Sequence, residues 1–431
     1  MGEGVNANNP NSYAFGKGAT ASADNAISMG LNATASRSSS FAINGVASGS
    51  NSFAVNGNAV GNYSKAFGVT SNGDYSLTSG SSVSTTVAAT YSIAMGYYVE
   101  ASGQSAVAIG SGKQLGTDVK VEAKGEGSIS MGSSTKANAK KSISIGSSTV
   151  ADGENSVSIG TVSTASGVAS LALGNFVTAG SAWSTAIGYN NLSYGDPTVA
   201  TLTDPLFIVG NGFSGSESNA MLIRKNGNVG IGENYPSLTL DVKRSVSNDF
   251  LARFRNTGDA ANCHGILVHA GSQTTGGAYL IGFARPNSSG ASILIGSVTQ
   301  NGISNVSYNT ASDARIKTNI IETHFGISDL MKVQVRDFEF REDFSGKTNT
   351  GFIAQELFDV YPLAVSKPID EEGLWQVDYG RVTPLIVKAV QDQQYMIESL
   401  SNENTQLKSE LKELKEEVEK IRLLISGTDS K

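Results

Sequence analysis

The sequence has few of the residues on which disulfide, metal and nucleic-acid chemistry depend. Its single cysteine, Cys263, excludes a disulfide framework and any zinc site built mainly from thiolates. Three histidines leave little material for a metalloenzyme, so we expect no metal and no cofactor. The formal net charge of −7 argues against a nucleic-acid partner, because neutralising phosphates requires clustered basic side chains.

Long apolar runs are also missing. No stretch of about 18 apolar residues is present, so we expect no membrane-spanning helix. The N-terminal segment before Ser12 has neither the basic nor the apolar region of a classical secretion signal. Either export follows another route, or Met1 opens a segment of a longer protein.

Charged residues are scarce in the first half of the chain. Of the 31 basic and 38 acidic residues, 19 lie in positions 1–200, 13 in 201–311 and 37 in 312–431. The first 200 residues are rich in Gly, Ser, Ala, Asn and Thr, a composition typical of a flexible linker. Apolar residues nevertheless recur there at regular places, which a linker lacks. We therefore expect a folded repeat, followed by a different kind of domain at the C-terminal end.

A short core recurs through this N-terminal part. It reads Ser or Ala, an apolar residue, a small residue, a second apolar residue, and Gly or Asn. The two apolar residues share one face of a short strand, because side chains alternate along a strand. The closing Gly or Asn tolerates the positive φ of a sharp turn. The cores are Ser12–Gly16, Ala26–Gly30, Ser40–Asn44, Ser52–Asn56, Ser64–Gly68, Ser92–Gly96, Ala106–Gly110, Ser128–Gly132, Ser142–Gly146, Ser156–Gly160, Ser170–Gly174 and Ser184–Gly188.

The spacing of the cores predicts a β-solenoid over residues 12–190. The last five cores end at residues 132, 146, 160, 174 and 188, a strict 14-residue step that leaves room for a second short strand. Two short strands per repeat cannot bury their own apolar face, but stacked repeats share one interior. No proline occurs between Pro10 and Pro197, so every N–H donor of the ladder is kept.

These units resemble the head repeats of trimeric autotransporter adhesins, of which the Yersinia adhesin is the type. The resemblance implies a mainly β fold in which three left-handed parallel β-rolls associate side by side into a rod. It also implies that such heads bind host matrix proteins or cells. A passive spacer rod is the alternative role for this segment.

Residues 191–245 are predicted to be a connector with β-hairpins. Turn dipeptides stand at Asn211-Gly212 and Asn226-Gly227, between apolar runs. The glycine-rich segment Lys225–Gly232 is not a dinucleotide loop, because the residues after it block a helix and lead into another strand. This segment resembles a recurrent element of phage tail fibres and bacterial fibre proteins.

Residues 246–311 are predicted to form a β-rich distal domain that three chains complete. The expected strands are Gly265–His269, Ala278–Phe283, Ser292–Gly296 and Ile303–Tyr308. Loops presented by a rigid scaffold often carry ligand contacts, so this domain is the candidate receptor-binding tip. The candidate contacts are His264, His269, Arg285 and Asn287, and the alternative is that they are ordinary surface or interface groups.

The composition changes at Ser312, where a segment with its own chemistry begins. A serine hydroxyl becomes a strong nucleophile when a base takes its proton, and an unprotonated lysine is one such base. A turn that brings residues five apart together would place Lys317 beside Ser312. Asp313 and Arg315 either orient this junction or simply pair with each other. His324 is a candidate for assisting proton transfer, with a structural role as the alternative.

The C-terminal part closely resembles the intramolecular chaperone of phage tailspikes and fibres, the self-cleaving S74 peptidases. The resemblance is carried by the segments Ser312–Ile320, Gly351–Glu356, Tyr361-Pro362 and Val377–Leu385. It implies that Ser312 and Lys317 form a catalytic dyad and that the chain is cut once at the junction of Ser312 and Asp313. Which side of Ser312 is cut, and whether the serine attacks its own chain or a neighbour's, stays open. Gln355 and Glu356 are expected to pack around the cleavage centre.

Apolar residues between positions 386 and 425 recur at alternating steps of four and three. This heptad pattern predicts a coiled coil with residues 390, 397, 404, 411, 418 and 425 at a and residues 386, 393, 400, 407, 414 and 421 at d. The residue types do not decide between two and three chains, but a three-chain roll upstream requires three. Asn404 at an a position either fixes the register or is a tolerated polar residue.

Together these features predict a small α+β self-cleaving chaperone over residues 312–385 and a trimeric coiled coil over residues 386–425. The leading interpretation is a homotrimeric fibre or adhesin that recognises a cell-surface glycan or protein receptor after one self-cleavage at Ser312. It would be a virion tail fibre, or an extracellular surface fibre if the source is a bacterium. A glycan-degrading tailspike is the alternative of another class, and it requires paired carboxylates in a groove. We expect no turnover of external substrates and no membrane insertion.

Overall fold

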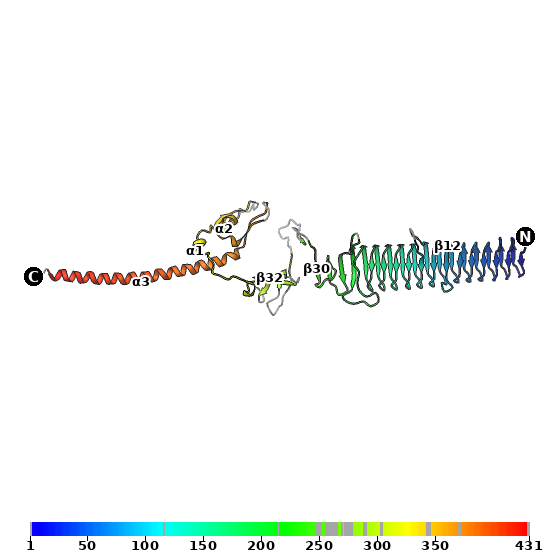
Figure 1. Ribbon diagram of the computed structural model, residues 1–431, viewed down its shortest axis with the longest axis horizontal. Coiled ribbons are helices and arrows are strands. Elements are labelled where there is room, and N and C mark those ends of the chain that lie inside the picture. Colours follow the sequence, from blue (N-terminus) through cyan, green and yellow to red (C-terminus); the bar gives the residue numbers. More distant parts are fainter. Residues whose placement is uncertain are drawn as a thin grey trace. The chain divides into compact units, whose positions relative to one another are not determined.

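The structure is a computed structural model. It describes residues 2–114, 117–213, 215–245, 251–254, 266–268, 270, 279–287, 291–301, 305–341, 346–368 and 372–428. The chain divides into two compact units, Met1–Gly265 and Ile266–Lys431. The first unit is a ladder of stacked coils, and the second ends in a long helix (Figure 1). The mainly β fold with a parallel roll and a C-terminal helix, predicted from the sequence, is confirmed.

Each coil of the roll contributes a strand to a long row and a strand to a short row, and strands of one row pair in parallel from coil to coil. The long row comprises β2 (Tyr13–Phe15), β4 (Ile27–Met29), β6 (Phe41–Ile43), β8 (Phe53–Val55), β10 (Lys65–Phe67), β12 (Leu77–Thr85), β13 (Ile93–Ala101), β14 (Val107–Ser111), β18 (Ile129–Ser133), β20 (Ile143–Ser147), β22 (Val157–Thr161), β24 (Leu171–Asn175) and β26 (Thr185–Tyr189). The short row comprises β1 (Asn6–Ala7), β3 (Thr20–Ala21), β5 (Thr34–Ala35), β7 (Val46–Ala47), β9 (Asn58–Ala59), β11 (Thr70–Ser71), β17 (Val121–Ala123), β19 (Lys136–Ala137), β21 (Val150–Ala151), β23 (Thr164–Ala165) and β25 (Thr178–Ala179). The C-terminal parts of β12 and β13 also belong to the short row.

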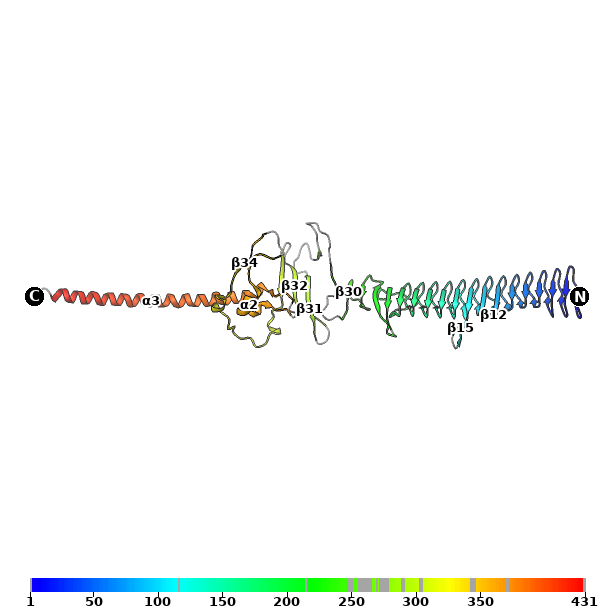
Figure 2. The ribbon, with the colours of Figure 1, turned by 90° about the horizontal axis from the view of Figure 1, so that it is seen from above.

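The 14-residue step of the sequence is the length of one coil in the regular part of the roll, whereas the coils from β6 to β12 are 12 residues long. β20 pairs with β22 so that Ile143 lies beside Val157 and Gly146 beside Gly160. The coil from β12 to β13 is 16 residues long, and the coil after β14 is longer still because the hairpin formed by β15 (Lys113–Gln114) and β16 (Thr117–Asp118) is inserted there. Figure 2 shows this hairpin projecting from the side of the roll.

Small side chains fill the interior of the roll. Ala42, Ala54 and Ala66 follow one another in the long row and are fully buried. Where the interior residue is a serine, its hydroxyl can bond within the coil: Ser144 Oγ donates to the carbonyl of Thr149 at 2.9 Å. A coil of 12 to 14 residues that closes on itself leaves little space between its two strands, which explains the small residue at the centre of each core.

The corners of the coils adopt left-handed backbone. Gly146 has φ of +127°, and a Cβ added there would collide with the carbonyl of Gly160 in the next coil. Asn25 and Asn155 take φ of 58° and 56° at a second corner, directly before a core, a conformation that asparagine tolerates better than most residues. The backbone therefore restricts which residues can close a core.

The two outer faces of the roll differ in polarity. The long row presents apolar side chains outward in coil after coil, and Phe15, Met131 and Leu173 are 47, 39 and 44% exposed. The short row presents residues such as Lys136 and Thr164. We call the first of these surfaces the long-row face. An apolar surface that continues over so many coils is typical of a protein interface.

The ladder continues beyond residue 190 into the connector. β27 (Pro205–Asn211) pairs in parallel with β26, and β28 (Asn219–Arg224) runs antiparallel to both β27 and β29 (Val229–Ile231). A turn at Asn226-Gly227, where Gly227 has φ of +91°, joins β28 to β29. β30 (Leu240–Val242) then pairs in parallel with β29.

The second unit contains a three-stranded antiparallel sheet of β31 (Tyr279–Pro286), β32 (Ser292–Asn301) and β33 (Asn305–Thr310). The strand expected at Gly265–His269 is not formed by its described residues. Ile266 and Leu267 are 65 and 89% exposed and have no strand partner among the described residues. Apolar content alone does not make a strand where no neighbouring strand accepts its hydrogen bonds.

The chaperone region follows the sheet and has its own small core, made by Leu357, Tyr361, Ala364, Val382 and Leu385. Its elements are η1 (Ala314–Ile316), α1 (Ile327–Leu330), β34 (Arg336–Phe338), β35 (Asn349–Gly351), α2 (Ala354–Val360), η2 (Pro362–Ala364), β36 (Val365–Ser366), β37 (Gln376–Val377) and η3 (Tyr379–Val382). β34 pairs with β35 and β36 with β37, both antiparallel.

The chain ends in α3 (Thr383–Thr428), whose heptad seam is open on the single chain. Leu400, Leu407, Leu414 and Ile421 of the d positions are 63, 56, 57 and 55% exposed. Leucines on a coiled-coil seam are normally covered by partner helices. No helix in the described ranges is long and apolar enough to cross a membrane.

Candidate functional site

The structure brings Ser312 and Lys317 together. β33 ends at Thr310, two residues before Ser312, and the chain then makes the single turn η1. Ser312 and Lys317 flank this turn, and Nζ of Lys317 donates a hydrogen bond to Oγ of Ser312 at 2.7 Å. The arrangement is that of a nucleophile hydrogen-bonded to a potential base.

Asp313 and Arg315 pair with each other and also shape the turn. The carboxylate of Asp313 accepts from the backbone N–H of Arg315 at 2.8 Å, which caps η1. The guanidinium of Arg315 adds hydrogen bonds to both carboxylate oxygens, at 3.0 Å from Nε and 2.6 Å from Nη2. These donors hold the pKa of Asp313 below its usual value, the side chain of Arg315 having the larger effect. The pair therefore supports the turn that separates Ser312 from Lys317.

The dyad is open to solvent on the single chain, where Ser312 and Lys317 are both exposed. A lysine accepts a proton only when its amine is unprotonated, and apolar surroundings favour that form. The geometry of a Ser-Lys pair is thus present, while the described part of this chain supplies no apolar cover for it.

The other residues singled out from the sequence lie outside this pair. The ring of His324 packs on Phe325, with 4.0 Å between ring centroids, and the described contacts include none between His324 and the dyad. Glu356 of α2 accepts two hydrogen bonds from Arg336 of β34, at 3.0 and 3.1 Å, and this pairing raises the pKa of Arg336. Gln355 is exposed on α2. Glu356 therefore links a helix to a strand within the chaperone region.

Two of the candidate receptor contacts lie near one end of the three-stranded sheet. Arg285 is an exposed residue of β31, and Asn287 closes the turn to β32 through its backbone N–H, which donates to Ala291 O at 2.8 Å. The side chain of Asn287 accepts from Ala291 N at 2.8 Å. His264 and His269 lie outside the described residues.

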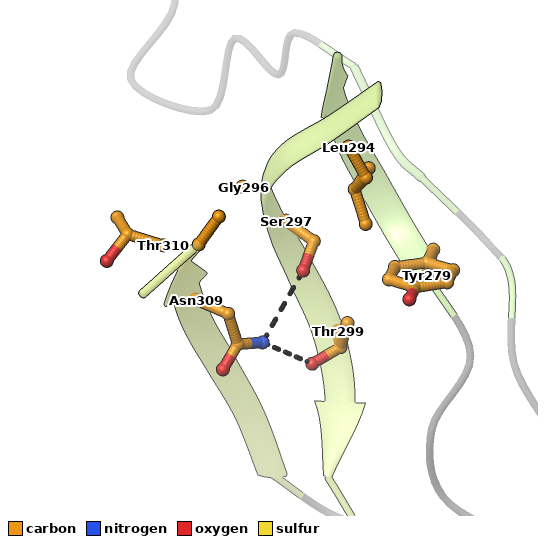
Figure 3. Close-up of a pocket in the computed structure, with 8 residues that line it drawn as sticks. Tyr279, Leu294, Gly296, Ser297, Thr299, Asn309 and Thr310 are labelled. Atoms are coloured by element: carbon orange, nitrogen blue, oxygen red, sulfur yellow. Dashed lines mark hydrogen bonds between the residues drawn. The ribbon is translucent and has the colours of Figure 1, made fainter. Parts of the chain in front are cut away.

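The structure adds a hollow that the sequence alone did not predict. Polar residues Ser297, Thr299 and Asn309 line this cavity of about 300 Å³ on one face of the sheet, together with Tyr279 and Leu294 (Figure 3). Nδ2 of Asn309 donates to Thr299 Oγ1 at 2.9 Å and lies 3.5 Å from Ser297 Oγ. The available signal was the alternation of polar residues at positions 297 and 299 and at 307 and 309, which places them on one face.

On α3, Asn404 is exposed and lines a shallow hollow with its seam neighbours Ile397 and Leu400. Its side chain is therefore placed where a partner helix would meet it in a coiled coil.

Comparison with protein families gives two matches. Residues 312–366 match the Peptidase_S74 family, described as the chaperone of endosialidase, and the match begins at Ser312. Residues 7–33, 88–112, 123–149 and 151–176 match the YadA head domain repeat. No curated protein matches the chain. The chain thus combines YadA-like head repeats with an endosialidase-type chaperone region, a combination that supports a trimeric adhesin or fibre of extracellular or surface location.

Proposed function

We propose that the protein is a homotrimeric fibre that cuts itself once at Ser312 and recognises a receptor on a cell surface. The observation that carries the proposal is the 2.7 Å hydrogen bond from Lys317 Nζ to Ser312 Oγ. It lies at the first residue of the region that matches the endosialidase chaperone.

Two open apolar surfaces support the trimeric state. The long-row face extends along the roll, and the heptad seam extends along α3. A single chain leaves both surfaces in contact with water. Burying them between chains would stabilise an assembly by roughly 25 cal/mol for each Å² of apolar surface. Association of identical chains covers both surfaces at once, and three chains are the number expected of the YadA-like repeats.

The cleavage chemistry follows from the dyad. The Ser312 hydroxyl gives its proton to the unprotonated amine of Lys317, and its oxygen attacks a peptide carbonyl carbon at the junction. The C–N bond breaks, and the departing amide nitrogen takes the proton from the lysine ammonium. Water then hydrolyses the ester and restores the serine hydroxyl. The net reaction is hydrolysis of one peptide bond, and each chain performs it once.

Assembly and cleavage are linked in this proposal because the dyad is exposed on the single chain. Neighbouring copies would supply the apolar cover that favours an unprotonated lysine. Chains that have not yet associated would then remain uncut, so the coiled coil would be released only after it has aligned three chains.

Receptor recognition is proposed from the YadA-like heads and from the polar groups of the distal sheet. Arg285 and Asn287 remain the candidate contacts that the structure describes. Cleavage does not depend on whether the receptor is a glycan or a protein, so the two parts of the proposal are tested separately.

A denaturing gel of the purified protein, with and without heating, tests cleavage and assembly together. Wild type should yield two fragments after heating and a trimer-sized band without heating. Ser312→Ala and Lys317→Ala should stay full length, because each removes one member of the dyad. Lys332→Ala is the matched control. Lys332 forms an ion pair with Asp329, with 3.1 Å between Nζ and Oδ1, and takes no part in the dyad, so this variant should be cut like wild type. Cutting of Ser312→Ala at the wild-type position would refute the proposal.

A further inference from the structure

The sheet β31–β33 has two unlike faces. One face carries the hollow of Figure 3, where Asn309 bridges Ser297 and Thr299 by hydrogen bonds. Ser297 is only 5% exposed, so its hydroxyl is enclosed by these polar neighbours. On the same face, Ser307 Oγ accepts from Asn301 Nδ2 at 2.9 Å. The polar groups of this face are thus largely satisfied within the sheet.

The opposite face is apolar. Ile281 lies beside Val298 and Val298 beside Tyr308 in the strand register, and Phe283 and Val306 are two positions along on the same side. We call these five residues the apolar sheet face. A hollow of about 350 Å³ is lined by Phe283, Val298 and Tyr308 of this face and also by Ser297 and Asn309, and none of its lining residues is charged.

The described chain leaves the apolar sheet face open. Tyr308 is 83% exposed, Phe283 53% and Val306 49%. A single sheet cannot cover its own apolar face, which needs a second layer packed against it. None of these five residues is charged, so identical copies of this face would not repel one another through them; Arg285, the next residue of β31 on this side, lies beyond Phe283 at the edge of the face.

Position in the chain indicates what supplies that layer. In the sequence, the sheet lies between the roll and α3. The long-row face of the roll and the heptad seam of α3 are the surfaces assigned above to contacts between copies. β33 ends two residues before Ser312, and the backbone N–H of Ala311 still donates to Ile295 O at 3.0 Å. A cut at Ser312 therefore leaves the whole sheet on the N-terminal fragment and separates it from α3.

We propose that the apolar sheet face packs against the same face of the two other copies and holds the C-terminal end of the fibre together after cleavage. The partner is thus a second and third copy of this chain. The inference rests on the proposed function, because it requires trimers that are cut at Ser312.

Photo-cross-linking tests which molecule covers the apolar sheet face. A benzoylphenylalanine at position 308, which replaces one aromatic side chain by another, is activated in the cleaved trimer, and the products are separated on a denaturing gel. The matched control carries the same group at position 307, on the polar face. We expect N-terminal fragments joined to each other from position 308 and not from position 307.

Two results would overturn the inference. A cross-link confined to one chain would mean that another part of the same chain covers the face. The absence of any cross-link from position 308 in a cleaved trimer would mean that the face is open. Loss of cleavage or of the trimer in wild type would instead refute the proposed function, so the two failures are distinguishable.

Substitution gives a second readout. Tyr308→Asp should leave cleavage intact but make amide hydrogen exchange across β33 at least tenfold faster in the cleaved trimer. Ser307→Asp, next to it on the polar face, and Tyr308→Phe should keep the wild-type exchange rate. Equal protection of β33 in Tyr308→Asp and wild type would contradict the assignment of this face to the contact between copies.

Discussion

At the scale of single residues, the glycine that closes each core is the position with the least freedom to change. Gly146→Ala should destabilise the roll by about 2–4 kcal/mol per chain, since left-handed backbone strains an alanine and strain of this kind costs roughly 1–3 kcal/mol before any collision is counted. The added Cβ would also press on the carbonyl of Gly160. Thermal unfolding followed by circular dichroism would measure the effect.

Ser147→Ala is the matched control for this substitution. Ser147 is the next residue of β20 and pairs with Thr161 in the same ladder, but it needs no left-handed backbone. It should unfold within a degree or two of wild type. Equal unfolding temperatures for Gly146→Ala and Ser147→Ala would contradict the importance of the close approach between coils.

The residue scale also shows what spacing alone can indicate. A separation of five residues led to the expectation that Lys317 lies beside Ser312, and the two side chains share a hydrogen bond in the structure. Their catalytic roles stay a prediction. The hollow around Asn309 was not foreseen, because alternation of Ser, Thr and Asn identifies a polar face without indicating whether that face is flat or concave.

At the scale of elements, a carboxylate links α1 to α3, beside the apolar packing of Leu330 on the core that contains Leu385. Oδ2 of Asp392 accepts from the backbone N–H of Ile327 at 3.2 Å, and Oδ1 accepts from Lys388 at 2.6 Å. The hydrogen bond from Lys388 holds the pKa of Asp392 below its ordinary value of 3.8. Because the folded pKa is lowered, the carboxylate stabilises the fold fully at pH values above its unfolded pKa. This stabilisation is lost as the pH falls from the unfolded pKa through the folded pKa.

Amide exchange across α1, corrected for intrinsic rates, should therefore be slow at pH 6 and faster at pH 3. Asp392→Asn should exchange quickly at both pH values, since it loses the charge that Lys388 stabilises. Asp359→Asn, which changes an exposed acid on α2, should respond to pH like wild type. A pH response of Asp392→Asn equal to that of wild type would exclude this carboxylate as the pH-dependent contact.

Elements with a strict period were the ones that sequence could predict. The 14-residue step and the heptads correspond to the roll and to α3, because each repeat meets the same physical constraint. The distal part was harder. β31 and β32 extend beyond the segments expected from apolar runs, to Pro286 and Asn301, because strand length depends on the pairing partner and not on local composition.

At the scale of the whole molecule, cleavage should make folding a one-way process. Strand pairing over a long roll is non-local and therefore slow. A coiled coil speeds folding because it holds three chains in register and so reduces the number of arrangements they must sample. A fibre that has lost α3 keeps its native structure only because unfolding is slow. Wild type heated past its transition should not recover, whereas the uncut Ser312→Ala trimer should refold.

Two successive heating scans measured by circular dichroism would show the difference. The second scan should repeat the first for Ser312→Ala and be flat for wild type. Lys332→Ala, which should be cut, is the control and should behave like wild type. Recovery of the cleaved protein to the same extent as the uncut one would show that the C-terminal fragment is not needed to regain the native state.

The interior of alanine, serine and threonine has a consequence for how such a molecule changes over evolutionary time. Since neighbouring coils of the regular part have nearly the same cross-section, loss or duplication of a 14-residue segment joins surfaces that already fit each other. Each event alters the reach of the fibre by about 4.8 Å, the spacing between paired strands. The length of the roll is thus adjustable in small, equal increments by recombination between similar stretches of gene, and the new junction needs no change in how the coils pack.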